Sequence, residues 1–173
     1  AMSLKNDITL KNVYYNYPNS SRTALKDVYM NIPTHNTVGI VGATGSGKTT
    51  TVDIILGLLE PEQGTLEVDG NVINKQNLRS WQSAIGYVPQ NIFLADDTVA
   101  ANIAFGIEPA EVNHEDIERS AKIAKLHEFV INELPQKYQT TIGERGIRLS
   151  GGQRQRIGIA RALYHSPKVL ILD

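Results

Sequence analysis

The chain contains no cysteine, and its charges almost cancel, since 17 lysines and arginines against 18 aspartates and glutamates give a net charge of −1. Without cysteine, a disulfide framework and a thiolate metal site are excluded. The small net charge provides no broad attraction for nucleic acid, so we expect no nucleic-acid partner. No apolar run approaches the roughly 20 residues that a membrane-spanning helix needs. The remaining composition, 173 residues of which 41% are hydrophobic, is that of an ordinary globular domain.

One stretch has a specific pattern. Residues Gly42–Thr49 read Gly-Ala-Thr-Gly-Ser-Gly-Lys-Thr and fit G-x-x-x-x-G-K-[ST] at every fixed position. The apolar run Thr37–Val41 before it predicts a buried strand, and Lys48–Leu59 after it predicts a helix. A glycine loop between a strand and a helix is the context in which this pattern binds phosphate. A glycine turn without a ligand is the alternative, and the flanking elements disfavour it.

The residue types in this loop suit phosphate chemistry. Glycine permits backbone conformations that other residues avoid and removes side chains from the path of a ligand. The loop N–H groups and the helix N-terminus favour an anion. Lys48 is predicted to contact the β and γ phosphates and Thr49 to bind Mg²⁺. The predicted nucleotide contacts in this region are Gly42, Thr44, Gly45, Ser46, Gly47, Lys48, Thr49 and Thr50.

The segments before the loop are rich in β-forming residues. Residues 8–17 and Ala24–Ile32 alternate loosely and are separated by turns, which predicts antiparallel strands beside the nucleotide core. Tyr17 precedes a proline at the end of the first strand. Its ring either packs in the sheet or stacks on an adenine, and from the residues alone packing is favoured.

The middle of the chain changes character. Ile85–Val88 predicts a short strand, and Gln90 follows it with an amide that can reach a metal or a water. Residues 92–135 show apolar residues at helical spacing and end at Pro135, which predicts a helical insert. Its apolar stripes are expected to be core rather than interface, and Asn113 is expected to cap one of its helices. A single glutamine after a strand is weak evidence for a site.

A second glycine-bearing helix start follows the insert. Leu149–Gln153 reads Leu-Ser-Gly-Gly-Gln and opens a predicted helix over Gln153–Tyr164. In isolation it is a serine-capped helix loosened by two glycines. Beside a phosphate loop it becomes a second helix end suited to an anion. Lys168–Asp173 then predicts a buried parallel strand whose aspartate lies at the ligand-binding edge, where its carboxylate can hold Mg²⁺.

These residues resemble the nucleotide-binding domain of an ATP-binding cassette (ABC) transporter of exporter type, over Ile8 to Asp173. The signature is its most specific element. The matching motifs are the Walker A loop Gly42–Thr49, the glutamine loop at Gln90, the signature Leu149–Gln153 and the Walker B strand Lys168–Asp173.

Two further stretches are similar to exporters, namely Thr141–Gly146 and Tyr17-Pro18. The second implies that Tyr17 stacks on the adenine of ATP, which reverses the preference for simple packing.

The resemblance also implies roles for individual residues. Lys48, Gln90 and Asp173 are implied to be catalytic, and Thr49, Gln90 and Asp173 to support the metal. Gln90 would sense the γ-phosphate and contact the membrane domains. A second copy of the domain would present its signature to the same ATP. The implied signature contacts are Ser150, Gly151, Gly152 and Gln153.

The implied fold class is α/β, a P-loop NTPase core with a mostly parallel sheet, an N-terminal antiparallel β subdomain and a helical insert. We expect one partial cassette domain over residues 1–173. Its expected parts are residues 8–36 (antiparallel β region), 37–91 (nucleotide-binding core), 92–148 (helical subdomain) and 149–173 (signature helix and Walker B strand).

The chain ends at Asp173, where the family normally continues with a catalytic glutamate and later a switch histidine. We therefore expect a domain truncated after the Walker B aspartate, without the C-terminal strands of the fold. Such a chain would hydrolyse ATP far more slowly than a complete domain. The strand order of the family further predicts a gap or abnormal pairing beside the Walker A strand.

The expected function is ATP binding and hydrolysis that powers export across a membrane. The expected cofactors are ATP and Mg²⁺, and the partners are a second nucleotide-binding domain, paired head to tail, and the transmembrane domains of an exporter. The expected place is the cytoplasmic face of the cell membrane. The alternatives are a non-transport cassette ATPase of DNA repair or translation, and a nucleotide-binding fragment without catalysis. A repair ATPase would carry a long coiled coil, and no long heptad run is present.

Overall fold

The computed structural model describes residues 2–173. The chain divides into two compact units, an N-terminal unit up to Ala84 and a C-terminal unit, Ile85–Asp173.

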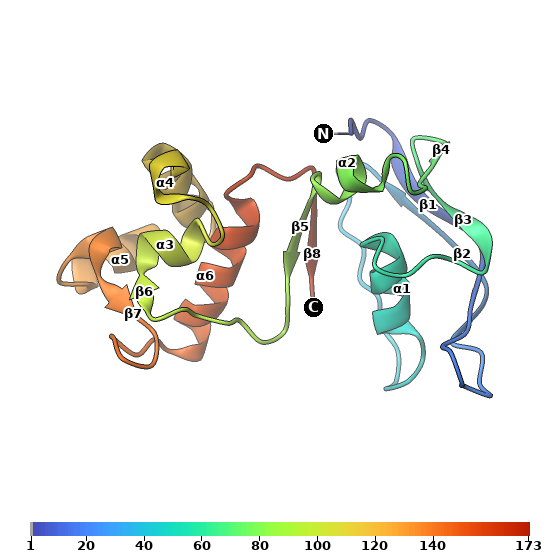
Figure 1. Ribbon diagram of the computed structural model, residues 1–173, viewed down its shortest axis with the longest axis horizontal. Coiled ribbons are helices and arrows are strands. Elements are labelled where there is room, and N and C mark those ends of the chain that lie inside the picture. Colours follow the sequence, from blue (N-terminus) through green and yellow to red (C-terminus); the bar gives the residue numbers. More distant parts are fainter. Residues whose placement is uncertain (1) are drawn as a thin grey trace. The chain divides into compact units, whose positions relative to one another are not determined.

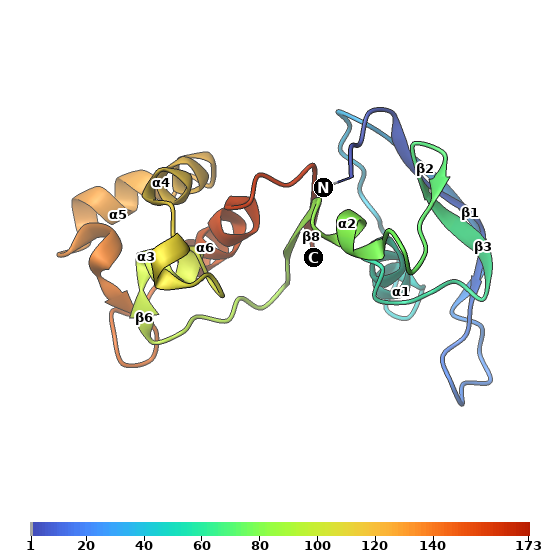
Figure 2. The same ribbon diagram turned by 45° about the horizontal axis from the view of Figure 1, so that its top comes forward.

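The N-terminal unit contains a four-stranded antiparallel sheet with the strand order β2-β1-β3-β4. Its strands are β1 (Asp7–Tyr15), β2 (Leu25–Pro33), β3 (Gln63–Val68) and β4 (Asn71–Val72). The long central strand β1 lies beside both β2 and β3 (Figures 1 and 2). Leu10, Val13 and Val68 lie in the core, where each is at most 1% exposed. Leu10 and Val13 are three positions apart, and the register of β1 shifts between them, so strict alternation is broken there. The expected N-terminal antiparallel β subdomain is confirmed, and its sheet also includes β3 and β4, which lie beyond residues 8–36.

Two short helices complete this unit, α1 (Lys48–Ile55) and α2 (Leu78–Gln82). Helix α1 is shorter than the predicted Lys48–Leu59, because Gly57 at φ 69° turns the chain after Leu56. The buried Trp81 of α2 donates its indole N–H to the carbonyl oxygen of Ile55 at 2.7 Å. A carbonyl at the end of a helix has no partner within the helix, so this bond fastens α2 to the end of α1.

The prediction of a buried strand over residues 37–41 is wrong. The structure has no strand there, and Val41 is 91% exposed. Within residues 2–173, the backbone of this segment forms no hydrogen bonds with a neighbouring strand. An apolar run becomes a strand only when another strand pairs with its N–H and C=O groups.

The C-terminal unit contains the parallel part of the fold, a pair formed by β5 (Ile85–Val88) and β8 (Val169–Leu172). The expected parallel sheet is therefore small. Helix α6 (Gly151–Leu163) approaches this pair closely, since a Cβ added to Gly86 would lie 2.7 Å from the carbonyl oxygen of Ala162. Strand β8 is parallel, as predicted. Two of its four aliphatic residues, Leu170 and Leu172, are exposed, Leu172 to 60%, so the prediction that the strand is buried is wrong.

The rest of this unit is mainly helical. It contains α3 (Val99–Ile103), η1 (Pro109–Glu111), α4 (His114–Ile123), α5 (His127–Glu133) and η2 (Lys137–Gln139), with the small ribbon β6 (Asp97–Thr98) and β7 (Thr141–Ile142). Helix α4 begins as its sequence predicts, because the Asn113 side chain accepts hydrogen bonds from the N–H groups of Glu115 and Asp116.

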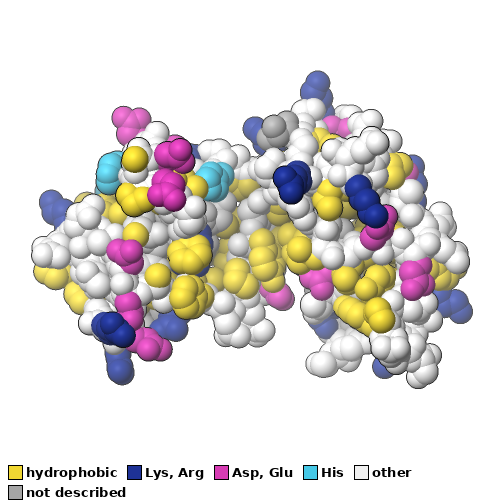
Figure 3. Space-filling view, in the orientation of Figure 1, with side chains coloured by type: hydrophobic (Ala, Val, Ile, Leu, Met, Phe, Trp, Pro, Cys, Tyr) yellow, Lys and Arg dark blue, Asp and Glu magenta, His cyan; other side chains and the backbone are white. Residues whose placement is uncertain are grey.

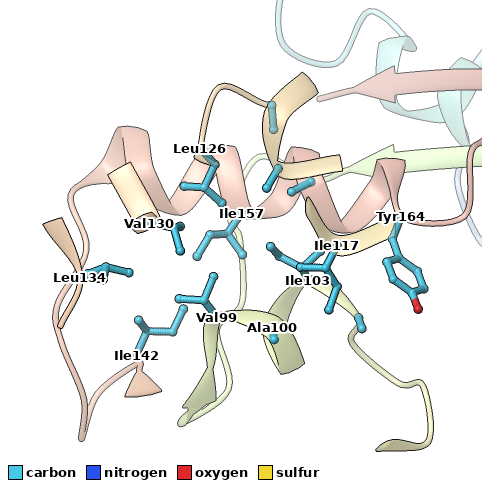
Figure 4. Packing of buried hydrophobic residues seen from close by; sticks show 14 residues of the cluster. Val99, Ala100, Ile103, Ile117, Leu126, Val130, Leu134, Ile142, Ile157 and Tyr164 are labelled. Carbon is cyan, nitrogen blue, oxygen red and sulfur yellow. The ribbon is translucent and has the colours of Figure 1, made fainter. Parts of the chain in front are cut away.

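Apolar side chains from these helices and from α6 converge on one cluster (Figure 4). Ile157 of α6 lies among residues of α3, α4 and α5 and is 1% exposed. Ile117, Leu126 and Val130 are as deeply buried. The helical stripes seen in the sequence are thus core positions, and they pack the helical region onto α6.

No helix of residues 2–173 is both long enough and apolar enough to span a membrane. Hydrophobic side chains are visible among charged ones on the face of each unit drawn in Figure 3.

Leu126→Ala is expected to lower the free energy of unfolding by about 2–5 kcal/mol, because it leaves a cavity in a fully buried cluster. Ile123→Ala, three positions earlier in the chain, is the control, since Ile123 is 58% exposed. It should change stability by less than about 0.5 kcal/mol. Urea denaturation followed by circular dichroism measures both, and equal losses would contradict the assignment of this core.

Candidate nucleotide-binding site

The loop before α1 has the conformation that its glycines predict. Gly45 has φ 77° and Gly47 has φ 96°, both in the left-handed region. Gly47 is the N-cap of α1 and offers no side chain to the helix. The first-turn N–H groups of a helix lack partners within the helix, and no acidic side chain lies in the first turn of α1. This helix end can therefore receive an anion.

Lys48 lies within the loop. Its Nζ donates hydrogen bonds to the carbonyl oxygens of Gly42 at 2.5 Å and Ala43 at 2.9 Å. The N–H of Ser46 donates to the carbonyl oxygen of Ala43 at 3.1 Å. The Lys48 ammonium group is therefore bonded to the backbone of the loop that precedes it. Thr44, Gly45 and Ser46 of this loop are exposed.

The three threonines after Lys48 differ. Thr49 is exposed, whereas Thr50 and Thr51 are buried. The Thr51 hydroxyl donates to the carbonyl oxygen of Gly47 at 2.8 Å. Of the three, Thr49 is the one whose hydroxyl is accessible to a ligand.

Tyr17 lies against the start of α1. Its hydroxyl forms a 3.0 Å hydrogen bond with Thr50 Oγ1, and its ring meets the ring of Tyr15 edge to face at 5.1 Å. The side chain remains 41% exposed. The structure thus brings Tyr17 together with the phosphate loop, although 33 positions separate it from Thr50. An exposed aromatic ring beside a phosphate site can stack on a base.

Gln90 and Asp173 lie at one edge of the C-terminal unit. Since Val88 of β5 pairs with Leu172 of β8, both residues follow the carboxyl ends of parallel strands. The N–H of Asp173 donates to the carbonyl oxygen of Val88 at 3.0 Å. The hydroxyl of Tyr87 donates to Asp173 Oδ2 at 3.3 Å. Gln90 and Asp173 are exposed, at the edge where open parallel sheets bind ligands.

The second helix start has its own geometry. Ser150 caps α6 through a capping box, in which its Oγ accepts the N–H of Gln153 at 3.2 Å and its own N–H donates to Gln153 Oε1 at 2.8 Å. Gly151 and Gly152 are exposed, and a Cβ added to either would meet nothing within 4 Å. The packing of this chain therefore does not require glycine at these two positions.

The predicted residues thus fall into two groups. Tyr17 and the loop residues lie together in the N-terminal unit. Gln90, Asp173 and the signature lie in the C-terminal unit. The roles of all these residues remain predictions.

Two contacts of the site residues are not predicted by any pattern in the sequence. The Tyr17–Thr50 bond joins a strand end to a helix far along the chain, and no local pattern predicts it. The Tyr87–Asp173 bond follows from the pairing of β5 with β8. It was predictable only if these two strands had been assigned as neighbours.

A phosphate loop at the start of one helix and a glycine-bearing, serine-capped start of another define the class of ATP-binding cassettes. The ABC transporter family matches residues 25–173 of this chain, and the chain therefore belongs to that family. It is the ATP-binding cassette of an exporter-type ABC protein, as its relatives show.

Among curated proteins, ATP-binding cassette sub-family B member 5 of Mus musculus is 42% identical over 98% of this chain, which is 13% of the mouse protein. The ATP-dependent lipid A-core flippase of Cupriavidus pinatubonensis is 40% identical over 98% of this chain and 29% of the flippase. Among solved structures, a bacterial Atm1-family ABC exporter with ATP bound aligns over the whole chain with a TM-score of 0.87 and 34% identity, covering 30% of that protein. The chain thus spans less than a third of the length of each of these relatives.

Gly47→Ala is expected to destabilise the chain by about 1–3 kcal/mol more than Gly45→Ala. Both glycines have positive φ, but only at Gly47 would a Cβ meet backbone, 2.9 Å from the carbonyl oxygen of Ala24. Around Gly45 nothing lies within 4 Å. Thermal unfolding of both variants measures the difference. Equal losses would mean that Gly47 is needed for its backbone conformation alone.

Proposed function

We propose that this cassette binds ATP with Mg²⁺ and that two cassettes, paired head to tail across two ATP molecules, hydrolyse the nucleotide to power export of a substrate across a membrane. The observation that supports this proposal most directly is the open surface over Gly151 and Gly152. Because no atom of residues 2–173 lies within 4 Å of a Cβ added to either glycine, a ligand or partner approaching from outside would explain them.

The phosphates of ATP are assigned to the loop before α1. Lys48 supplies a positive charge that is already held at the loop by the carbonyl oxygens of Gly42 and Ala43. The helix end adds N–H groups and partial positive charge. Tyr17, fixed by its bond to Thr50, offers its exposed ring to the adenine. The N-terminal unit thus offers one set of groups for the phosphates and an aromatic ring for the adenine.

Magnesium prefers hard oxygen ligands and usually keeps several waters. The Thr49 hydroxyl, the Gln90 amide oxygen and the Asp173 carboxylate are of this kind, and all three residues are exposed. Tyr87 orients the Asp173 carboxylate through its hydroxyl. When bound, the ion neutralises phosphate charge, which is a main part of catalysis in phosphoryl transfer.

The signature is assigned to the ATP held by the partner cassette. Ser150, Gly151, Gly152 and Gln153 present a capped helix start without side-chain bulk. Because each nucleotide would then contact both cassettes, binding closes the pair, and hydrolysis with product release lets it open.

Export is proposed from the relatives. They include a lipid A-core flippase and an ABC exporter, of which this chain covers the cassette portion. Transmembrane domains of an exporter are accordingly the proposed partners, and the cytoplasmic face of a membrane is the proposed location. Residues 1–173 are proposed to act as one cassette domain.

Lys48→Ala is expected to weaken ATP binding at least tenfold, which corresponds to about 1.4 kcal/mol. Lys75→Ala, at an exposed lysine of the same unit, is the control and should bind ATP as the parent chain does. Calorimetric titration with ATP and Mg²⁺ measures both affinities. Unchanged affinity in Lys48→Ala, with folding verified by circular dichroism, would refute the assignment of the phosphate site.

Gly152→Ala tests the role of the signature. Alanine favours a helix over glycine by about 1 kcal/mol, and its Cβ meets nothing, so the variant should unfold at a higher temperature. The same Cβ would occupy the space assigned to the partner's phosphate. We therefore expect ATP-dependent pairing, measured by analytical ultracentrifugation, to be lost while ATP binding to the single chain persists. Pairing at the level of the parent chain would count against the head-to-tail arrangement.

A further inference from the structure

We propose that Arg161 and Asn102 are positioning residues that fasten the segment after Gln90 to the signature helix, so that the two respond to nucleotide together. The segment in question is residues 91–98. The nucleotide-dependent part of this inference rests on the proposed function, whereas the attachment itself does not.

Arg161 lies near the end of α6 and reaches across to the segment. Its Nε donates to the carbonyl oxygen of Asn102 at 2.8 Å, and its Nη2 donates to the carbonyl oxygen of Phe93 at 2.9 Å. The guanidinium also lies 4.8 Å from the centre of the Phe105 ring, a distance at which a cation is attracted to the ring face. One side chain of the signature helix thus binds the backbone of two other elements.

Asn102 also forms hydrogen bonds with the backbone of residues 91–98. The residue is fully buried on α3. Its Oδ1 accepts the N–H of Ala95 at 2.9 Å, and its Nδ2 donates to the carbonyl oxygens of Ala95 and Thr98, each at 3.0 Å. Arg161 Nη2 reaches the same Oδ1 at 3.4 Å. The segment is therefore bonded at Phe93, Ala95 and Thr98 by this one pair of side chains.

The chemistry of Arg161 is unusual for a stabilising contact. Burial lowers the pKa of its guanidinium, and no carboxylate among residues 2–173 forms an ion pair with it. Its partners are carbonyl oxygens and an aromatic face. Removing a cation from water is costly, and an apolar residue would fill the same space without that cost. The fork of fixed donors explains the arginine, since it sets the distance between two backbones.

A second connection joins residues 91–98 to the stretch that precedes the signature. Asp96 Oδ1 accepts the N–H of Arg145 at 3.0 Å, and β6 pairs with β7 in the stretch that precedes Ser150. Gly143, at φ 115°, allows this approach, because a Cβ there would lie 2.4 Å from Asp96 Oδ1. The segment after Gln90 is thus bonded both to the chain that enters α6 and to a residue near its end.

The consequence concerns two elements that the proposed function places at ATP. Gln90 leads directly into residues 91–98, and Ser150 begins α6. Because the segment is bonded at both ends of the signature element, a displacement of α6 by nucleotide moves the segment with it. Without Arg161, the connection at the far end of α6 is lost while Ser150 and its capping box stay intact.

The test is hydrogen-exchange mass spectrometry on the 173-residue chain with three variants. Arg161→Lys keeps a positive charge but cannot donate to both carbonyls from a fixed fork. Asn102→Ala removes the second member of the pair. Arg154→Ala is the matched control, since it removes an exposed arginine of the same helix. Peptides that cover residues 91–98, residues 149–153 and α4 are followed, first without nucleotide and then with ATP and Mg²⁺.

Without nucleotide, we expect exchange in residues 91–98 to be at least tenfold faster in Arg161→Lys and Asn102→Ala than in the parent chain, with Arg154→Ala unchanged. Exchange in α4 should stay at the parent rate in Arg161→Lys. Faster exchange everywhere would indicate a merely structural role and overturn the proposal, as would an unchanged segment in Arg161→Lys.

With ATP, we expect the 149–153 and 91–98 peptides to respond together in the parent chain. In Arg161→Lys, the 149–153 peptide should respond as in the parent chain and the 91–98 peptide should respond less, because only the connection through Asp96 and Arg145 remains. A response of the 91–98 peptide in that variant as large as in the parent chain would overturn the coupling. If the 149–153 peptide of the parent chain does not respond to ATP, the proposed function fails, and the nucleotide-free comparison still decides whether Arg161 and Asn102 hold the segment.

Discussion

The backbone N–H groups in the first turn of an α-helix have no acceptor within the helix, and the function proposed for this chain depends on that constraint. At α1, the N-cap is Gly47, which offers no side-chain acceptor. At α6, Ser150 satisfies one N–H, and the next two positions are glycines with open space around them. The first site holds its own counter-charge, Lys48, whereas the second has no cation in its capping box. This difference fits the proposed function, in which the start of α1 provides most of the affinity for ATP. The start of α6 would contact the nucleotide only when another cassette approaches.

The features that the sequence predicts well are local. The glycine conformations of the phosphate loop, the Asn113 cap of α4 and the serine cap of α6 all depend on neighbours within a few residues. The helical stripes were assigned to the core, and Ile117 and Leu126 lie there. The exporter resemblance rests on the same kind of short pattern. The family model agrees that the chain is an ABC cassette, and the relatives agree on the exporter type.

The features that the sequence did not predict depend on contacts between distant segments. Residues 37–41 have the composition of a strand, but composition does not provide the partner that a strand requires. The Tyr17–Thr50 bond and the bonds of Arg161 to Asn102 and Phe93 join segments 33, 59 and 68 positions apart. Contacts of this kind are specified by geometry in three dimensions, and no local pattern in the sequence marks the residues that form them.

The single tryptophan of the chain is the residue that ties α2 to the end of α1. Its indole is fully shielded from solvent and hydrogen-bonded to the helix whose opposite end forms the phosphate loop. Indole emission depends on the polarity and hydrogen bonding of its surroundings, and no other tryptophan contributes background. The chain therefore contains a built-in optical reporter of the state of α1, which can be read without any label.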